Sequence, residues 1–378
     1  MIFPVDQETA RWIQKTISRM RCKNDWATLA SREACWTPAF LSALIDEADS
    51  LVTAGLGQPA YDLSRHLQLL AERIRRDEGP EGELLHRSLV VWSTVVHASS
   101  CRLTSRFVEC EALFRAAFDR SAAGVLSWAR GELARRYGIY LLQRSDLTSF
   151  DWADQAIAAF VGNPERLAET LLFRGVAHSY ITADNAAAIS DFTAAASLLL
   201  SLRSNRAQRN LFVAFHNIAR QLVADPTQSL SGLGQARKLI QASRRNFGPG
   251  ISLRKLTSIW VEALLVHRMG WNRHGERLLE KAREGFRKLN FHDEFIMATL
   301  DLVLLLHEDG EPKRAIEVLE SSAPLIADRC RSAPQVRAGW KPTLDKDDLL
   351  RLRGEVQDQL RPTWRQAKNP GYTLSNSN

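Results

Sequence analysis

Apolar residues recur at a helical period along almost the whole chain. Apolar side chains return every three or four positions in segments such as FLSALIDEADSLV, LFVAFHNIARQLV and IEVLESSAPLI, which is the spacing of one face of an α-helix. The sequence contains no alternating β-branched runs bounded by Asn-Gly or Asp-Gly turns. We therefore predict an all-α protein.

Turn and capping residues divide this pattern into pairs of helices. Thr37-Pro38, Asn163-Pro164 and Asp225-Pro226 each place a capping side chain before a proline, and Asn205 with Gln208 suits a capping box. Gly55, Gly270 and Gly310 suit the turns between paired helices, and Gly248-Pro249-Gly250 predicts a break between helices. The seven predicted pairs are 37–54 with 58–77, 83–100 with 104–120, 124–143 with 147–161, 165–182 with 185–202, 206–223 with 226–246, 251–269 with 272–289, and 292–308 with 312–328.

Outside the pairs we predict two more helices, at 5–23 and at about 345–360. The expected organisation is an N-terminal capping helix in residues 1–36, a repeat array in 37–328, and a basic helix with a disordered tail in 329–378.

Small residues recur within the pairs at intervals of twelve and then seven positions. Two antiparallel helices pack closely only where side chains are small, so this spacing is typical of stacked helical hairpins. For the fifth pair two registers stay open, Ser229 with Ala236 or Ala236 with Ser243. The clearest trios are Ala263, Gly275 and Ala282; Val303, Ala315 and Ser322; and Val176, Ala188 and Ala195.

These positions resemble the tetratricopeptide repeat (TPR), most clearly in WVEALLVHRMGWNRHGERLLEKAREGF and LDLVLLLHEDGEPKRAIEVLESSAPLI. The resemblance spans about residues 37–328 and is closest to degenerate, stand-alone bacterial TPR proteins. Unit periods near 40 exceed the usual length, and the Trp, Gly and Tyr positions of the family are mostly filled otherwise. The resemblance implies an α-solenoid, a right-handed superhelix of about seven hairpins, whose concave groove binds a peptide or protein segment. It implies no catalytic residues.

The resemblance also implies which residues face the groove. An aromatic-and-arginine set is what peptide-binding hot spots favour. The alternative is that Trp92, Phe173 and Trp260 pack against the next hairpin, and that His267 and His307 are partly buried rings bonded to neighbouring groups. The implied partner-binding residues are Trp92, Arg102, Phe173, Tyr180, His216, Arg220, Trp260, His267 and His307.

Cysteine and histidine spacing gives no sign of a metal or a cofactor. The five cysteines form no CxxC pair, and the chain has no HxxxH or HExxH motif. We expect Cys101 and Cys110 to be small buried residues. Nucleophile and phosphate-binding motifs such as GxSxG and GxxxxGK[ST] are missing as well, so we expect no enzyme, no cofactor and no metal.

The net charge of +7 is concentrated at one end, because residues 329–378 carry ten Lys/Arg and five Asp/Glu. Basic runs at 135–144, 243–248 and 351–368 mix arginine with residues such as Tyr137 and Trp364, which would suit nucleic acid, but the excess charge is small for that role. The alternative is that these runs are helix ends and a solvated tail.

Apolar runs are too short to span a membrane, and the first residues lack a signal-peptide pattern, so we expect a cytoplasmic protein.

Together these features predict a protein–protein interaction module, an adaptor or regulatory scaffold, that binds a peptide or protein segment. The alternative is a peptide-sensing transcriptional or signalling regulator with weak nucleic-acid contact through its basic C-terminal segment. The sequence identifies neither the partner nor an oligomeric state.

Overall fold

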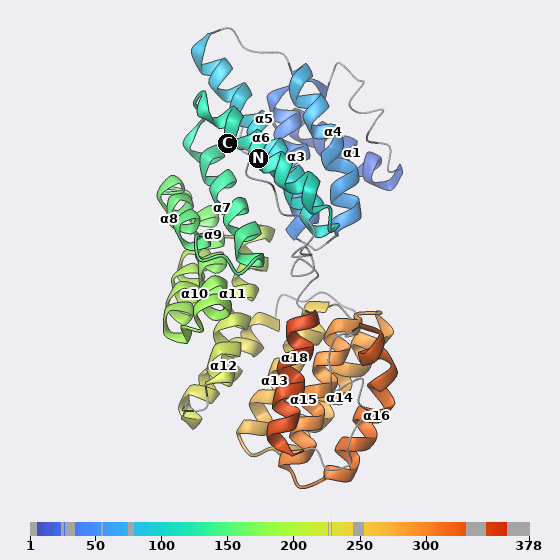
Figure 1. Cartoon of the computed structure of the whole chain (residues 1–378). Coiled ribbons are helices and arrows are strands. Elements are labelled where there is room, and N and C mark those ends of the chain that lie inside the picture. The colour runs from blue at the N-terminus through green and yellow to red at the C-terminus, as the bar shows by residue number, and fades with distance from the viewer. Residues whose placement is uncertain are drawn as a thin grey trace, which may run out of the picture. The chain divides into compact units, whose positions relative to one another are not determined.

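The computed structural model describes residues 6–23, 26, 35–53, 56–74, 79–225, 227, 229–244, 253–329 and 345–360 (Figure 1). The regular structure of these residues is helical and includes no strand, which confirms the all-α prediction. They fall into two compact units, of which the first ends at Ile181 and the second begins at Thr182. We call them the N-terminal unit and the C-terminal unit.

The N-terminal unit is built from successive helical hairpins. Helix α3 packs on α4, α5 on α6, and α7 on α8, while α3, α5 and α7 also contact one another in turn and α7 contacts α9. We call α3, α5, α7 and α9 the A-layer of this unit. The helices are α1 (Gln7–Lys23), α3 (Pro38–Thr53), α4 (Gly57–Arg73), α5 (Pro80–Leu103), α6 (Phe107–Ala122), α7 (Ser127–Gln143), α8 (Ser149–Ala159) and α9 (Pro164–Ala177), followed by a π-helical turn at His178–Thr182.

The C-terminal unit continues the same construction. Its helices pair as α11 with α12, α13 with α14, and α15 with α16, and α18 packs against α15. Leu349, Leu352 and Val356 of α18 enter the same apolar core as Leu302 and Leu306 of α15. The helices are α10 (Asn185–Leu199), α11 (Asn205–Ala224), α12 (Leu230–Arg244), α13 (Leu253–Arg268), α14 (Asn272–Lys288), α15 (His292–Glu308), α16 (Pro312–Arg329) and α18 (Lys346–Leu360).

Every predicted helix is present in the described residues, and six of the seven predicted pairs pack as hairpins. The fourth pair, α9 with α10, is divided between the two units, so its packing stays a prediction. The division into a cap at 1–36, an array at 37–328 and a tail at 329–378 also stays a prediction. Gly55, the break at 248–250 and the predicted disordered tail lie outside the described residues.

Helix starts agree with the capping prediction at two places and correct it at two others. The side chains of Thr37 and Asn163 accept hydrogen bonds from the backbone N–H of Phe40 (3.2 Å) and Arg166 (3.2 Å), as expected for N-caps. At the start of α11, however, Ser204 is the cap and accepts from the Ala207 N–H at 2.9 Å, one residue earlier than predicted.

Asp225 does not start the helix that follows it. Its side chain accepts from the Thr227 N–H at 2.9 Å, a local turn, and α12 begins only at Leu230. Ser229 is exposed and accepts from the Gly232 N–H at 3.2 Å, so it caps α12. The register that placed Ser229 at a helix crossing is therefore wrong, and the side chain of Ser243 lies outside the described part of the chain.

Small residues do lie where paired helices cross. Ala263 and Ala282 are fully buried between α13 and α14. A Cβ atom added to Gly275 would lie 2.9 Å from the Ala263 carbonyl oxygen and 2.9 Å from the Cβ of His267, so the two backbones nearly touch there. Val303, Ala315 and Ser322 are buried in the same way between α15 and α16.

Among the described helices, none is both long and apolar enough to cross a membrane.

We predict that Gly275→Ala lowers the free energy of unfolding by about 1–2 kcal/mol, because overpacking at the crossing outweighs the better helix propensity of alanine. The matched control is Gly234→Ala in α12, where nothing lies within 4 Å of the added Cβ, and which should raise stability by up to about 1 kcal/mol. Urea denaturation followed by circular dichroism measures both. Equal effects of the two changes would show that the crossing is not close.

Candidate functional site

Two of the residues predicted to face a groove belong to the core. Trp92 of α5 is fully buried, and its ring lies 5.3 Å from that of Trp128 in an edge-to-face arrangement. Phe173 of α9 is 5% exposed and covers Gly138 of α7, where an added Cβ would lie 2.8 Å from the phenyl ring. Both side chains fill the space between neighbouring helices, so the packing alternative holds for them and the predicted partner contact is corrected.

The two other predicted residues of the N-terminal unit reach the surface. Arg102 is half-buried at the end of α5, and burial lowers the pKa of its guanidinium to about 10. Tyr180 lies in the π-helical turn with 39% of its surface exposed. Their roles as partner contacts stay predictions.

In the C-terminal unit, Trp260 and His267 are bonded to the next hairpin. The indole Nε1 of Trp260 donates to Asp301 of α15 at 2.8 Å, and Arg353 of α18 binds the same carboxylate. The Nε2 atom of His267 lies 3.1 Å from Asp309, just after α15. These contacts agree with the alternative in which Trp260 packs against the next hairpin and the His267 ring is bonded to a neighbouring group.

His307 is half-buried in α15. It lies beside Ala315 and Leu349 around a cavity of only about 20 Å³.

His216 and Arg220 are neighbours on α11, one turn apart. Burial, and after it the positive charge of Arg220, lower the pKa of His216 to about 4. The imidazole stacks on Phe212 at 5.7 Å between ring centres, and Arg220 is exposed. The nine predicted residues are thus spread over both units.

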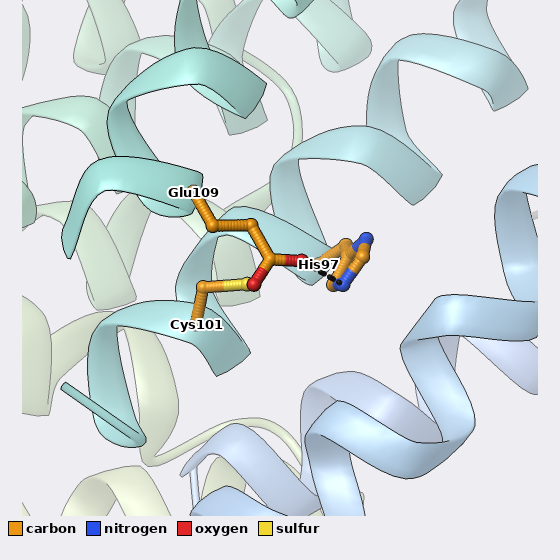
Figure 2. Close-up of side chains that lie close together, drawn as sticks. All are labelled: His97, Cys101 and Glu109. Atoms are coloured by element: carbon orange, nitrogen blue, oxygen red, sulfur yellow. Dashed lines mark ion pairs between the residues drawn. The ribbon is translucent and has the colours of Figure 1, made fainter. Parts of the chain in front are cut away.

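The N-terminal unit contains two polar clusters that the sequence analysis does not predict. The first consists of His97 and Cys101 of α5 and Glu109 of α6 (Figure 2). One nitrogen, sulfur or oxygen atom from each residue lies within 4.8 Å of the others, and the Nε2 atom of His97 is 3.6 Å from Glu109 Oε1. Among the described residues this is the one group of three such side chains close enough to hold a metal ion.

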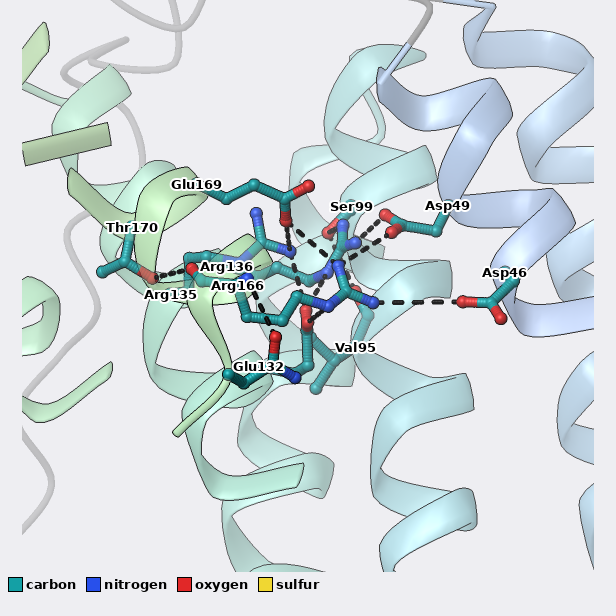
Figure 3. A network of polar contacts seen from close by, with 11 residues as sticks. Asp46, Asp49, Val95, Ser99, Glu132, Arg135, Arg136, Arg166, Glu169 and Thr170 are labelled. Carbon is teal, nitrogen blue, oxygen red and sulfur yellow. Dashed lines mark hydrogen bonds and ion pairs between the residues drawn. The ribbon is translucent and has the colours of Figure 1, made fainter. Parts of the chain in front are cut away.

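The second cluster is an ion-pair network across the A-layer (Figure 3). Its centre is Glu132 of α7. The Oε2 atom of Glu132 accepts hydrogen bonds from Arg135 at 2.7 Å and from Arg136 at 3.2 Å, and its Oε1 atom lies 3.0 Å from Arg166 Nε. Arg135, Arg136 and Arg166 are each less than 10% exposed. Buried guanidinium groups are tolerable only when paired, and here each of the three has a carboxylate.

The outer members of the network come from the other helices of the A-layer. Asp49 of α3 is fully buried and binds Arg136 and, at 3.3 Å, Arg166. Glu169 of α9 accepts from Arg166 at 3.1 Å, and Ser99 of α5 accepts from Arg136 at 3.1 Å. The network therefore connects α3, α7 and α9 through charged side chains, and the hydroxyl of Ser99 adds α5 to it.

Asp46 connects the network to a surface hollow. Its carboxylate lies 3.9 Å from Arg166 Nη2, and the side chain is 31% exposed. The hollow lies between α1 and α3 and has a volume of about 370 Å³, within the size range of ligand pockets. Its lining includes Ile13, Ile17, Ser18, Asp46, Glu47 and Ser50.

Sequence reasoning missed both clusters for the same reason. The spacings within one helix, His97 with Cys101, Glu132 with Arg136 and Arg166 with Glu169, are common on solvated helix faces. What makes these groups exceptional is their burial among side chains of other helices. Arg135 and Arg136 also open the basic run at 135–144, and both are buried in ion pairs, so these two arginines lie neither at a helix end nor on the surface.

Comparison with known proteins identifies the fold. No protein-family model and no curated protein matches the chain. A Rap protein solved in complex with competence and sporulation factor aligns over 84% of this chain and 89% of its own, with a TM-score of 0.57 and 13% identity. Aspartyl phosphate phosphatase F from Bacillus subtilis aligns over 84% of each chain, with a TM-score of 0.50 and 10% identity. Such identities show a shared fold alone, that of the TPR-like helical-repeat proteins, an α-solenoid.

The lowered pKa of His216 predicts a pH dependence of stability. Between about pH 6.5 and pH 4 the unfolded ring binds a proton that the folded ring does not, so stability present above pH 6.5 is lost as the pH falls toward 4. Between about pH 7 and pH 4.5, the free energy of unfolding of His216→Gln should therefore fall by about 2 kcal/mol less than that of the original chain. Urea denaturation at both pH values measures the difference, with the exposed His274→Gln as control. Parallel losses in all three proteins would contradict the prediction.

Proposed function

We propose that this chain is a protein-interaction module, an adaptor or regulatory scaffold, that binds a peptide or protein segment at the hollow between α1 and α3. The observation that carries the proposal is the hollow itself, where apolar Ile13 and Ile17 lie beside acidic Asp46 and Glu47. A wall of this kind suits a long basic side chain, whose aliphatic stem contacts the isoleucines while its charged end approaches the carboxylates.

The ion-pair network supports the proposal by fixing the position of Asp46. Arg166 is bound by Asp49, Glu132 and Glu169 as well, so Asp46 faces a guanidinium that is held from three other directions. A binding site built on rigid helices requires little ordering when a partner arrives, and the affinity is correspondingly greater.

The fold comparison points the same way. The similar Rap protein was solved as a complex with competence and sporulation factor, so a chain of this fold does hold another molecule. Helical-repeat proteins commonly bind a partner through an extended surface to which successive hairpins contribute side chains.

A displayed library of random peptides, selected against the whole purified chain, provides the test. Selected peptides are synthesised and their affinity is measured by fluorescence anisotropy. We expect an enriched motif that contains a lysine or an arginine. Selection of no peptide above background would contradict the proposed function.

Asp46→Asn should weaken the selected peptide by about tenfold, because it removes one charged hydrogen-bond acceptor from the hollow. The fold should be retained, since Arg166 keeps its three other carboxylates. The matched control is Asp62→Asn on α4 of the same unit. The Asp62 carboxylate accepts a hydrogen bond from Gln58 at 2.7 Å and is not part of the lining of the hollow. Equal affinities of the two variants would place the binding site elsewhere.

Ser18→Trp should block the hollow, because Ser18 is exposed on α1 and lines it. We expect a loss of at least about tenfold in peptide affinity, as filling a pocket removes the contacts of the buried side chain. Arg19→Trp is the control, since Arg19 is exposed on the same helix and is not part of the lining. Unfolding is monitored by circular dichroism. An unchanged affinity of Ser18→Trp would exclude this hollow.

A further inference from the structure

We propose that His97, Cys101 and Glu109 form a zinc-binding site in the N-terminal unit. The three side chains offer one nitrogen, one sulfur and one oxygen ligand, and the ligand atoms lie within 4.8 Å of one another (Figure 2). These are the three donor types that bind Zn²⁺ in proteins. The site is separate from the hollow between α1 and α3.

The state of His97 is the strongest observation. The residue is 6% exposed, and neither ring nitrogen has a hydrogen-bond partner. The Oε1 atom of Glu109 lies 3.6 Å from Nε2, which is beyond hydrogen-bond distance. A buried polar group without a partner is costly, and a cation between the two atoms would satisfy both.

The distances fit a tetrahedral ion. With Zn–N and Zn–O bonds of about 2.0–2.2 Å and a Zn–S bond of about 2.3 Å, neighbouring ligands of a tetrahedron lie about 3.3–3.6 Å apart. The separation of His97 Nε2 and Glu109 Oε1, 3.6 Å, already has this value, and no separation in the group exceeds 4.8 Å. The side chain of Glu109 is partly exposed, so its rotation can adjust the distances from its carboxylate to the other two ligands.

The helices hold the donors in place. His97 and Cys101 are four residues apart on α5 and share one face, while Glu109 lies in the first turn of α6. Tyr61 of α4 donates its hydroxyl to both oxygens of Glu109, each at 3.3 Å, and so orients the carboxylate as an outer-shell partner does. Three protein ligands leave the fourth position to water.

The charges around the donors favour a cation. Glu109 places a carboxylate between the other two donors, and its Oε1 lies 3.6 Å from His97 Nε2. Zn²⁺ binds the deprotonated thiol, so its binding would release the proton of Cys101. A thiolate and a carboxylate would together neutralise the two charges of Zn²⁺.

The whole chain, freed of metal with a chelator, is titrated first with Zn²⁺ and then separately with Co²⁺. We expect one Zn²⁺ bound per chain by equilibrium dialysis, and a Co²⁺ complex with the absorption of a thiolate-ligated, four-coordinate ion. Binding without thiolate absorption, or no binding, overturns the proposal. These two measurements need no variant, so they decide the question even if a variant fails to fold.

Variants then assign the ligands. Cys101→Ala should abolish the thiolate absorption, and His97→Gln should weaken Zn²⁺ binding by about 100-fold, since each removes one of three ligands. Glu109→Gln should weaken it by at least about tenfold. The matched control is Cys110→Ala, a fully buried cysteine of the same hairpin that is outside the group of three.

Cys110→Ala should keep the Co²⁺ absorption and the Zn²⁺ affinity within about twofold of the original chain. If it loses the absorption as Cys101→Ala does, or if Cys101→Ala keeps it, the assignment of the ligands is wrong.

Discussion

The close approach of paired helices is the constraint on which the rest of this structure depends. At Gly275 the backbone of α14 nearly touches the carbonyl of Ala263 in α13, and no side chain fits between them. Neighbouring A-layer helices in the N-terminal unit also meet at glycine, since Gly138 of α7 lies under the ring of Phe173 from α9. Large side chains are thereby confined to the spaces beside each crossing, where they form the apolar core.

This packing explains how charged residues come to be buried together. Where helices of the A-layer lie side by side, residues distant in sequence share one interior space. Asp49 and Arg166 are 117 positions apart, yet they lie within ion-pair distance. Breaking one such pair would leave an unpaired charge in the interior, so the network makes the relative placement of α3, α7 and α9 specific even if its net contribution to stability is small.

The helices could be predicted because their signals are local. Apolar period, capping residues and turn glycines placed the helices to within a few residues. Two of the three small trios placed the crossings of α13 with α14 and of α15 with α16. Whether a side chain is buried, in contrast, depends on residues that are distant in the sequence. A position inherited from a family resemblance does not distinguish a groove-facing Trp92 from a core Trp92, because that depends on whether Trp128 covers it. The ion-pair network and the His97 cluster depend on several helices at once, and no spacing along one helix indicates them.

The two buried clusters differ in one physical respect, and that difference separates a structural role from a binding role. In the network every guanidinium meets a carboxylate, so the charges satisfy one another without outside help. At His97, Cys101 and Glu109 an imidazole, a thiol and a carboxylate face one another, and the Tyr61 hydroxyl donates to the carboxylate. A buried imidazole with two unbonded nitrogens is a cost that folding alone does not remove. A divalent cation bound at Nε2 removes part of this cost, because it supplies the positive charge that the network already contains.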